Sequence, residues 1–205
     1  MEDKLYADGQ DRSRDTRSRL RELALQLFAE QGYEKTSLRE IAEQLGVTKA
    51  ALYYYFKSKE DIVRSLVEDY VAELDELIAW AKGQPRTAET RADIITRYLE
   101  IVANGAAVFR MLHQNQAAVS GLAAAKERGE LFRERMDALV DLLSDGPDAP
   151  LREQVRAATC LTSLSYGCMH YMDRVASPDE LKSALLEVAF ELTGARPRLA
   201  AAARS

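Results

Sequence analysis

The sequence predicts an all-α protein of about nine helices. Apolar residues recur every three or four positions along almost the whole chain, which is the period of an amphipathic helix. Segments with this pattern are separated by turn signals, of which Ser144-Asp145-Gly146-Pro147 is the clearest. The 205 residues are enough to bury a core without metal or disulfide cross-links.

Charge is distributed unevenly, which predicts two parts. The net charge is −5, yet residues 12–59 carry ten Lys and Arg against six acidic residues. We therefore expect a small basic N-terminal unit on a larger acidic body, and a local positive surface is what phosphate binding requires. The expected divisions are a flexible N-terminal arm over 1–12, a basic helical domain over 13–59, a larger helical domain over 60–194, and a flexible tail over 195–205.

Four helices are expected in the N-terminal part. The first runs from about Arg14 to Gln31 and ends at Gly32. Two short helices, over about 38–45 and 49–56, are capped by Ser37 and Thr48 and separated by Gly46. A long fourth helix reaches about residue 82. The remaining helices are expected over about 88–102, 108–113, 122–143, 150–175 and 178–193.

The two short helices form a helix-turn-helix pattern. A glycine between them allows the tight reversal that this motif needs. The second helix leaves an outward face that is small, polar, cationic and aromatic and carries no acid, as a helix in the major groove requires. Thr48, Lys49, Ala50, Tyr53 and Tyr54 make up this face. The pattern alone also fits an ordinary helix pair, but core packing rarely uses three consecutive tyrosines, since only one or two can face inward.

This segment resembles the DNA-binding domain of the TetR family of transcriptional repressors. The resemblance covers about residues 14–64 and is carried by the runs FAEQGY (28–33), TSLREIA (36–42), GVTK (46–49) and LYYYFKSKE (52–60). It implies DNA contacts at Ser37, Thr48, Lys49, Ala50, Tyr53, Tyr54 and Lys59. It also implies that 13–59 is a helix-turn-helix DNA-binding domain and 60–194 a regulatory and dimerisation domain. The expected protein is a homodimer that represses transcription from a palindromic double-stranded DNA operator and is released by a small-molecule inducer.

A basic run precedes the motif and has two interpretations. Arg12, Arg14, Arg17, Arg19 and Arg21 could contact phosphates or the minor groove. They could equally form a solvated helix face with ion pairs to nearby acids.

Soft, adaptable side chains in the C-terminal part predict a largely apolar ligand cavity. The candidate lining residues are Trp80, Tyr98, Val102, Phe109, His113, Met136, Tyr166 and Met169. A plain helix-bundle interior would need the same residue types, so that alternative stays open.

The last helix carries apolar residues on two sides and must bury both. We expect Leu181, Leu185, Val188 and Leu192, with Leu164 of the preceding helix, to form a dimer interface. Packing of both stripes within one chain is the alternative.

The sequence suggests no metal, no cofactor and no enzymatic activity. Cys160 and Cys168 are eight residues apart with no C-x-x-C motif, and no P-loop, G-x-S-x-G or H-E-x-x-H motif is present. A redox role for either cysteine stays open. No apolar run approaches the ~20 residues of a membrane span, so we expect a cytoplasmic protein with no membrane partner. Two alternative functions stay open, a helical ligand-binding protein without operator binding and a small helical enzyme.

Overall fold

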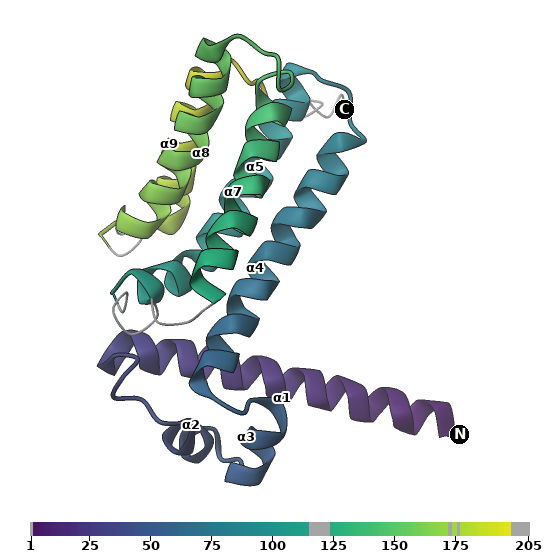
Figure 1. Ribbon diagram of the computed structural model, residues 1–205, viewed down its shortest axis with the longest axis vertical. Coiled ribbons are helices and arrows are strands. Elements are labelled where there is room, and N and C mark those ends of the chain that lie inside the picture. The colour runs from purple at the N-terminus through teal and green to yellow at the C-terminus, as the bar shows by residue number, and fades with distance from the viewer. Residues whose placement is uncertain (1, 115–123, 172–173, 176, 198–205) are drawn as a thin grey trace, which may run out of the picture. The chain divides into compact units, whose positions relative to one another are not determined.

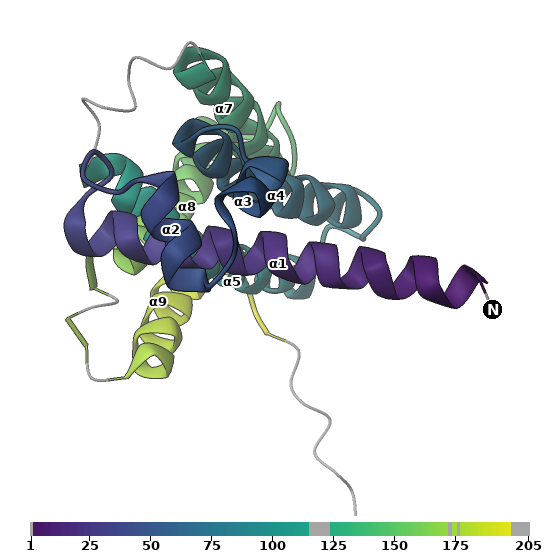
Figure 2. The same ribbon diagram turned by 90° about the horizontal axis from the view of Figure 1, so that it is seen from below.

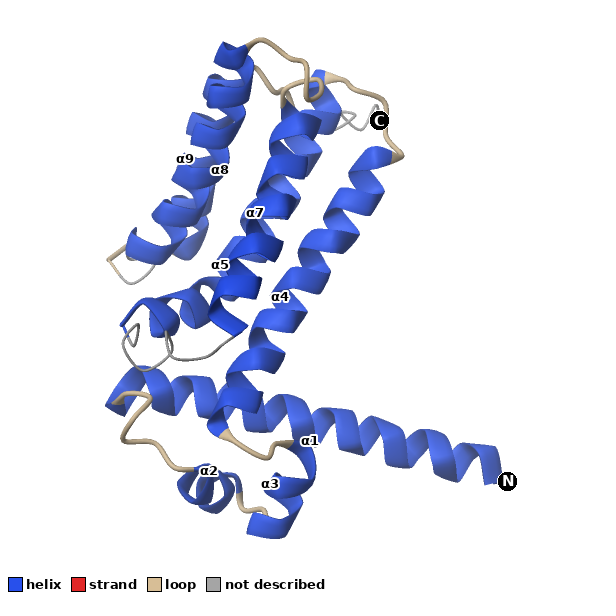
Figure 3. Ribbon diagram, in the orientation of Figure 1, coloured by secondary structure: helices blue, strands red, loops and turns tan. Residues whose placement is uncertain are grey.

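The computed structural model describes residues 2–114, 124–171, 174–175 and 177–197, and these form eight helices and no strand (Figure 1, Figure 3). The all-α prediction is confirmed. The helices are α1 (Glu2–Gln31), α2 (Leu38–Leu45), α3 (Lys49–Tyr55), α4 (Lys59–Lys82), α5 (Ala88–Gln114), α7 (Ala124–Leu143), α8 (Leu151–Tyr171) and α9 (Pro178–Thr193).

Helices α1 and α5 differ most from the sequence prediction. Helix α1 begins at Glu2, whereas an arm was expected up to residue 12; the segment holds no proline that would break a helix. Helix α5 runs unbroken through Asn104 and Gly105, where two separate helices were expected. Gly105 is buried, and Val102, Ala106 and Val108 on either side of it are buried too, so the apolar face continues across the glycine.

The described residues fall into two compact units. The first, here called the head, comprises residues 2–69 and 107–114; the second, here called the body, comprises residues 70–106 and 124–197. The border therefore lies within α4, after Asp69, and is crossed again within α5. The sequence had placed the division before α4, at residues 59 and 60.

A single apolar core holds the helices of the head together. Figure 2 shows α2 and α3 as neighbours, and Figure 1 shows both on one side of α1. The core residues are Leu20, Ala24, Leu27, Phe28, Tyr33, Ile41, Ala42, Leu52, Phe56, Ile62, Val63 and Met111. They come from α1 to α5, so α3 is fixed by contacts from every neighbouring element of the head.

The turn between α2 and α3 has the caps that the sequence predicts. Ser37 Oγ accepts from the backbone N–H of Glu40, and Thr48 Oγ1 accepts from that of Ala51, both at 3.1 Å. Gly46 has a φ of 74°, a left-handed conformation that favours glycine because it has no Cβ. These local bonds end α2 and start α3 within three residues.

The body packs α8 against α9 and α7. Gly167 of α8 packs against Leu185 of α9. A Cβ added at this glycine would be 2.4 Å from Leu185 Cδ2. Cys160 Sγ of α8 is 4.0 Å from the carbonyl oxygen of Ala189 in α9. Small residues on α8 therefore allow the close approach of α9.

The beginning of the expected flexible tail is part of the folded body. Gly194 ends α9 with a φ of 66°, Ala195 is buried, and the Arg196 N–H donates to the Ala88 carbonyl at 3.1 Å. The prediction of a flexible tail from residue 195 is wrong for these two residues, because burial of a methyl group and one backbone hydrogen bond anchor them at the start of α5. Residues 198–205 lie outside the described part.

None of the described helices combines the length and the apolar character needed to cross a membrane.

Replacing Gly167 by alanine should destabilise the body. The new methyl group must displace Leu185, and overpacking of this kind lowers the free energy of unfolding by about 1–3 kcal/mol, more than alanine gains in helix propensity. Urea unfolding measures the change. Gly83→Ala is the control, because its Cβ would meet only a backbone oxygen at 3.5 Å, an ordinary contact. Equal stability of Gly167→Ala and the unsubstituted chain would contradict the packing described here.

Candidate functional site

Helix α3 presents one face to the core and the other to solvent. Leu52 is fully buried and Phe56, which follows the helix, is nearly so. On the opposite face, Lys49 and Ala50 are exposed, Tyr53 is 42% exposed and Tyr54 is 81% exposed. The structure therefore brings the outward residues predicted on α3 together on one exposed surface, here called the α3 face.

The α3 face combines one cation with aromatic rings. Lys49 Nζ lies 5.5 Å from the centre of the Tyr53 ring, and the Tyr54 and Tyr55 rings meet edge to face at 5.1 Å. No acidic side chain occurs among the seven residues of α3. The hydroxyls of Tyr53 and Tyr54 and the ammonium of Lys49 can donate to anionic oxygens, so the surface suits a negatively charged partner.

Ser37 and Thr48 stand at the N-termini of α2 and α3, and both are exposed. Each hydroxyl oxygen is already used as the acceptor in its helix cap. A hydroxyl also carries one proton to donate. The caps therefore leave both side chains able to donate to a phosphate oxygen while they hold the helix ends.

The Lys59 side chain forms hydrogen bonds and a cation–π contact within the head. Its ammonium donates to the Tyr33 carbonyl at 2.6 Å and to the Glu34 carbonyl at 3.5 Å, and lies 4.4 Å from the centre of the Tyr33 ring. These contacts tie the first turn of α4 to the loop between α1 and α2. They offer another role for a residue that the resemblance assigns to DNA.

A second bond strengthens the same junction. The Tyr33 hydroxyl donates to Glu60 Oε1 at 2.7 Å, and the Tyr33 ring packs at 5.0 Å from the Phe28 ring. The hydrogen bond from Tyr33 is the largest of the effects that hold the pKa of the Glu60 carboxyl below its usual value. Burial, followed by this bond to a carboxylate, raises the pKa of Tyr33. The pair Tyr33–Glu60 is a structural feature of the head that the sequence did not predict, because its partners are 27 residues apart.

Three residues of the basic run on α1 make contacts within the chain. Arg17 lies over the Phe56 ring at 5.2 Å, and Arg21 forms an ion pair with Asp69 of α4. Arg19 is near Asp15, at 4.0 Å, and both are exposed. The side chains of Arg12 and Arg14 lie outside the described part.

The candidate cavity residues do not gather in one place. Tyr98 is fully buried in the body, where its hydroxyl lies 2.8 Å from Ser165 Oγ and 3.6 Å from Met136 Sδ. Burial raises the pKa of Tyr98 to about 12. Val102 is buried one turn further along α5. Tyr98, Met136 and Ser165 thus place a few polar atoms inside an apolar interior.

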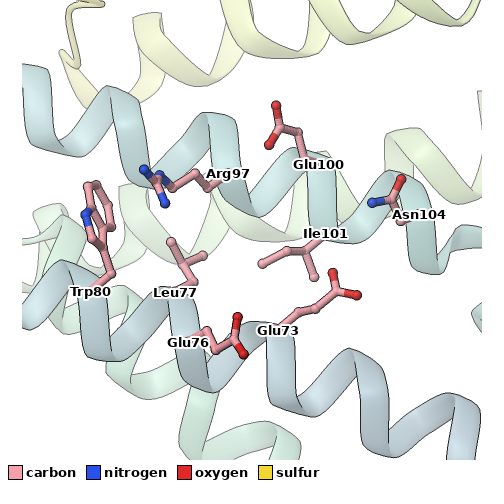
Figure 4. Close-up of a pocket in the computed structure, with 8 residues that line it drawn as sticks. All are labelled: Glu73, Glu76, Leu77, Trp80, Arg97, Glu100, Ile101 and Asn104. Carbon is pink, nitrogen blue, oxygen red and sulfur yellow. The ribbon is translucent and has the colours of Figure 1, made fainter. Parts of the chain in front are cut away.

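The other candidates lie elsewhere. Trp80 lines an open groove between α4 and α5 (Figure 4). Tyr166 is on the exposed side of α8, stacked on His170 at 3.9 Å, so its assignment to the interior with Tyr98 is wrong. The sequence could not separate the two sides of α8. Met169 is half-buried, Phe109 belongs to the head, and the side chain of His113 lies outside the described part.

The residues predicted to form a dimer interface differ in their exposure. Leu164 is fully buried within the single chain, so its assignment to a dimer interface is wrong. Leu185 packs on Gly167, and Leu181 and Leu192 are half-buried. Val188 is 50% exposed.

Further exposed apolar residues lie on α8. Leu151 is 74% exposed and Val155 is 54% exposed, and Tyr166 is exposed on the same helix. The four-residue spacing of Leu151 and Val155 was the available sequence signal, since it places both on one side of a helix. Exposed large apolar side chains on both α8 and α9 mark a surface suited to a protein partner.

Both cysteines are buried free thiols. Burial raises the pKa of Cys160 to about 12 and also raises that of Cys168, so both thiols stay protonated and are poor nucleophiles at neutral pH. Among the described residues, no group of three or more His, Cys, Asp and Glu is placed to hold a metal ion.

Comparison with known proteins identifies the N-terminal segment. The family profile for bacterial regulatory proteins of the tetR family matches residues 20–66, which include α2, α3 and the start of α4. Residues 20–66 form a tetR-family helix-turn-helix domain. The HTH-type transcriptional regulator AcrR of Shigella flexneri is 41% identical over 66 residues, which is 31% of either chain. The chain aligns with less than two thirds of the length of the curated relatives it matches first.

Solved structures extend the similarity in fold beyond the tetR-family domain. PfmR of Thermus thermophilus, a TetR family transcriptional regulator, has a TM-score of 0.69 at 20% identity and is matched over 88% of this chain and 100% of its own. The transcriptional regulator FadR of Bacillus subtilis, solved in complex with stearoyl-CoA, has a TM-score of 0.61 at 20% identity over 87% of this chain and 98% of its own. These neighbours share the fold over most of the chain.

Removing the Tyr33 hydroxyl should change the acid stability of the protein. Because the pKa of Glu60 is lowered in the folded state, its contribution to stability is present above the unfolded pKa of about 4.3 and is lost as the pH falls through the lower folded value. Tyr33→Phe removes the main cause of this shift and keeps the ring. The variant should therefore lose less stability than the unsubstituted chain between neutral and acidic pH, as measured by urea unfolding at several pH values. Parallel pH profiles of the two proteins would contradict this role of the bond.

Proposed function

We propose that this protein is a DNA-binding transcriptional regulator that binds a palindromic operator as a homodimer and represses transcription. The observation that carries the proposal is the α3 face, a solvent-exposed surface of Lys49, Ala50, Tyr53 and Tyr54 on the second helix of the helix-turn-helix in a tetR-family domain. The family resemblance implies that the protein represses transcription and does not activate it.

The chemistry of the α3 face suits the major groove of DNA. The Lys49 ammonium can donate to a guanine edge or to a phosphate, and small Ala50 permits close approach of the helix. The tyrosine hydroxyls can donate to phosphates, and their rings can contact thymine methyl groups. Ser37 and Thr48 add hydroxyl donors at two helix N-termini, where the backbone favours an anion.

Dimerisation would proceed through α8 and α9. Leu151, Val155, Tyr166 and Val188 are exposed on these helices in the single chain. A second copy would cover them in an isologous contact of four helices. Two α3 helices about one turn of DNA apart, ~34 Å, would then read the two halves of a palindrome.

The body is proposed to bind a small, largely apolar ligand that releases the operator. The interior around Tyr98 and Met136 combines apolar walls with a few polar atoms. The complex of the Bacillus subtilis neighbour with stearoyl-CoA makes long-chain acyl thioesters the first class to test. Such a ligand can weaken DNA binding only by its differential affinity for the two conformations of the protein.

Selection from a pool of random duplexes tests the function. The purified protein is incubated with the pool at moderate salt, and the bound duplexes are sequenced. Enrichment of a palindrome supports a dimeric, site-specific regulator. The absence of enrichment, repeated after unfolding, dialysis and refolding to remove any bound ligand, would favour the alternative of a helical ligand-binding protein without operator binding.

Two substitutions on the α3 face should weaken operator binding. Lys49→Ala and Tyr53→Ala each remove a group placed to touch a base or a phosphate, and a base contact is worth about 1–3 kcal/mol of binding free energy. Titration of the selected operator measures the change, and circular dichroism checks that the helices remain. Lys82→Ala is the matched control, since this lysine is exposed in the body, at the far end of α4. Unchanged affinity of both variants would show that this face does not bind DNA.

A charge placed on the exposed apolar surface of α8 and α9 should dissociate the dimer. Val155→Glu combined with Val188→Glu would bury two carboxylates per subunit without partners, which is strongly unfavourable. Sedimentation velocity should report a dimer for the unsubstituted chain and a monomer for the variant. Arg133→Glu, at an exposed position of α7, serves as the control. An unsubstituted chain that sediments as a monomer, or a variant that remains dimeric, would contradict the proposed interface.

A further inference from the structure

A groove of about 460 Å³ lies between α4 and α5 of the body. It spans about two turns of each helix, with Glu73, Glu76, Leu77 and Trp80 from α4 and Arg97, Glu100, Ile101 and Asn104 from α5 (Figure 4). This volume is in the range of small-molecule sites, which run from about 300 to 1,000 Å³. It is separate from the buried cluster around Tyr98 and from the α3 face.

The floor of the groove is apolar, and one end is aromatic. Leu77 and Ile101 line the groove between the polar side chains, so apolar atoms form its floor where methylene groups can pack. At the Trp80 end, the Arg97 guanidinium lies 4.0 Å from the indole ring (Figure 4). The indole ring therefore already has a cation against its face. The negative potential of that face favours such a contact.

Some of the polar groups that line the groove have unused hydrogen-bonding capacity. Within the described part of the chain, the carboxylates of Glu76 and Glu100 and the amide of Asn104 form no hydrogen bond and no ion pair. In the same part of the chain Arg97 forms no ion pair, although three carboxylates line the groove, and its guanidinium lies over the Trp80 ring instead. An internal network of ion pairs would have satisfied these groups, so the groove presents them to solvent or to a ligand.

Charge decides the class of ligand. Three carboxylates against one guanidinium make the lining net negative, so the groove repels fatty acids and acyl thioesters and attracts cations. The carboxylates occur along both helices, and the apolar floor lies between them. An extended molecule with an ammonium group at each end and methylenes between matches this arrangement better than a compact inorganic ion.

We propose that the groove between α4 and α5 binds an aliphatic diamine. The ammonium groups pair with the carboxylates of Glu73, Glu76 and Glu100, the methylene chain covers Leu77 and Ile101, and the ligand competes with Arg97 for the Trp80 ring. This binding does not depend on the proposed function, because it needs neither DNA nor a dimer.

Trp80 provides a direct test, because it is the single tryptophan of the chain. Its fluorescence is followed while the full-length protein is titrated, without DNA, with terminal diaminooctane. The neutral terminal octanediol and the dicarboxylate suberate have chains of the same length and serve as controls. A saturable change with the diamine alone is expected. No saturable change with the diamine, or an equal response to the diol or to suberate, would overturn the proposal.

Substitutions identify the groove as the place of binding. Glu76→Gln and Glu100→Gln should each weaken the diamine about two- to fivefold, as expected for loss of a solvent-exposed ion pair. Arg97→Gln should strengthen it, since this change removes a like charge and uncovers the indole. Glu187→Gln, at an exposed position of α9, should have no effect. Unchanged affinity in both glutamate variants of the groove, or an equal loss in Glu187→Gln, would overturn the assignment.

Failure of this experiment and failure of the proposed function are distinguishable. The fluorescence titration reports on the groove of the body in the absence of DNA, whereas the duplex selection reports on DNA binding by the head and on dimerisation. A protein that selects a palindrome but ignores the diamine would overturn the amine site and support the regulator.

Discussion

Burial of Leu52 in the core of the head is the constraint on which the rest of the candidate DNA-binding surface depends. This side chain has no exposed area, and α3 is only seven residues long, so fixing one residue fixes the rotation of the whole helix. Helices this short are not stable by themselves, because nucleation is costly. The core and the two N-terminal caps thus decide which side chains of α3 face outward. The chemistry of the α3 face follows from packing on its far side.

Local features of the sequence predicted the head well. The caps at Ser37 and Thr48 and the reversal at Gly46 depend on residues within a few positions of one another, so spacing alone revealed them. The role of Lys59 could not be found in this way. Its partners are backbone carbonyls 25 and 26 residues earlier, and only the fold brings them within reach.

The body was harder to predict because α8 is apolar on two sides. Leu164 and Tyr166 are two residues apart, and the periodicity of the sequence does not say which of them faces the interior of the chain. The structure places Leu164 in the core and leaves Tyr166 exposed, the reverse of the expected assignment. The groove between α4 and α5 was missed for a similar reason, since its carboxylates are indistinguishable in sequence from a solvated helix face.

The head is discontinuous in the chain, and this affects the order in which the protein can fold. Met111 is a fully buried member of the head core, yet the core residue before it in the sequence is Val63, and residues 70–106 of the body lie between them in the chain. A nascent chain that has left the ribosome up to residue 69 still lacks this side chain. The tetR-family domain would therefore complete its core only as α5 emerges, although domains are commonly thought to fold in order from the N-terminus. For the same reason, one cut after residue 69 would leave a head without one of its core residues.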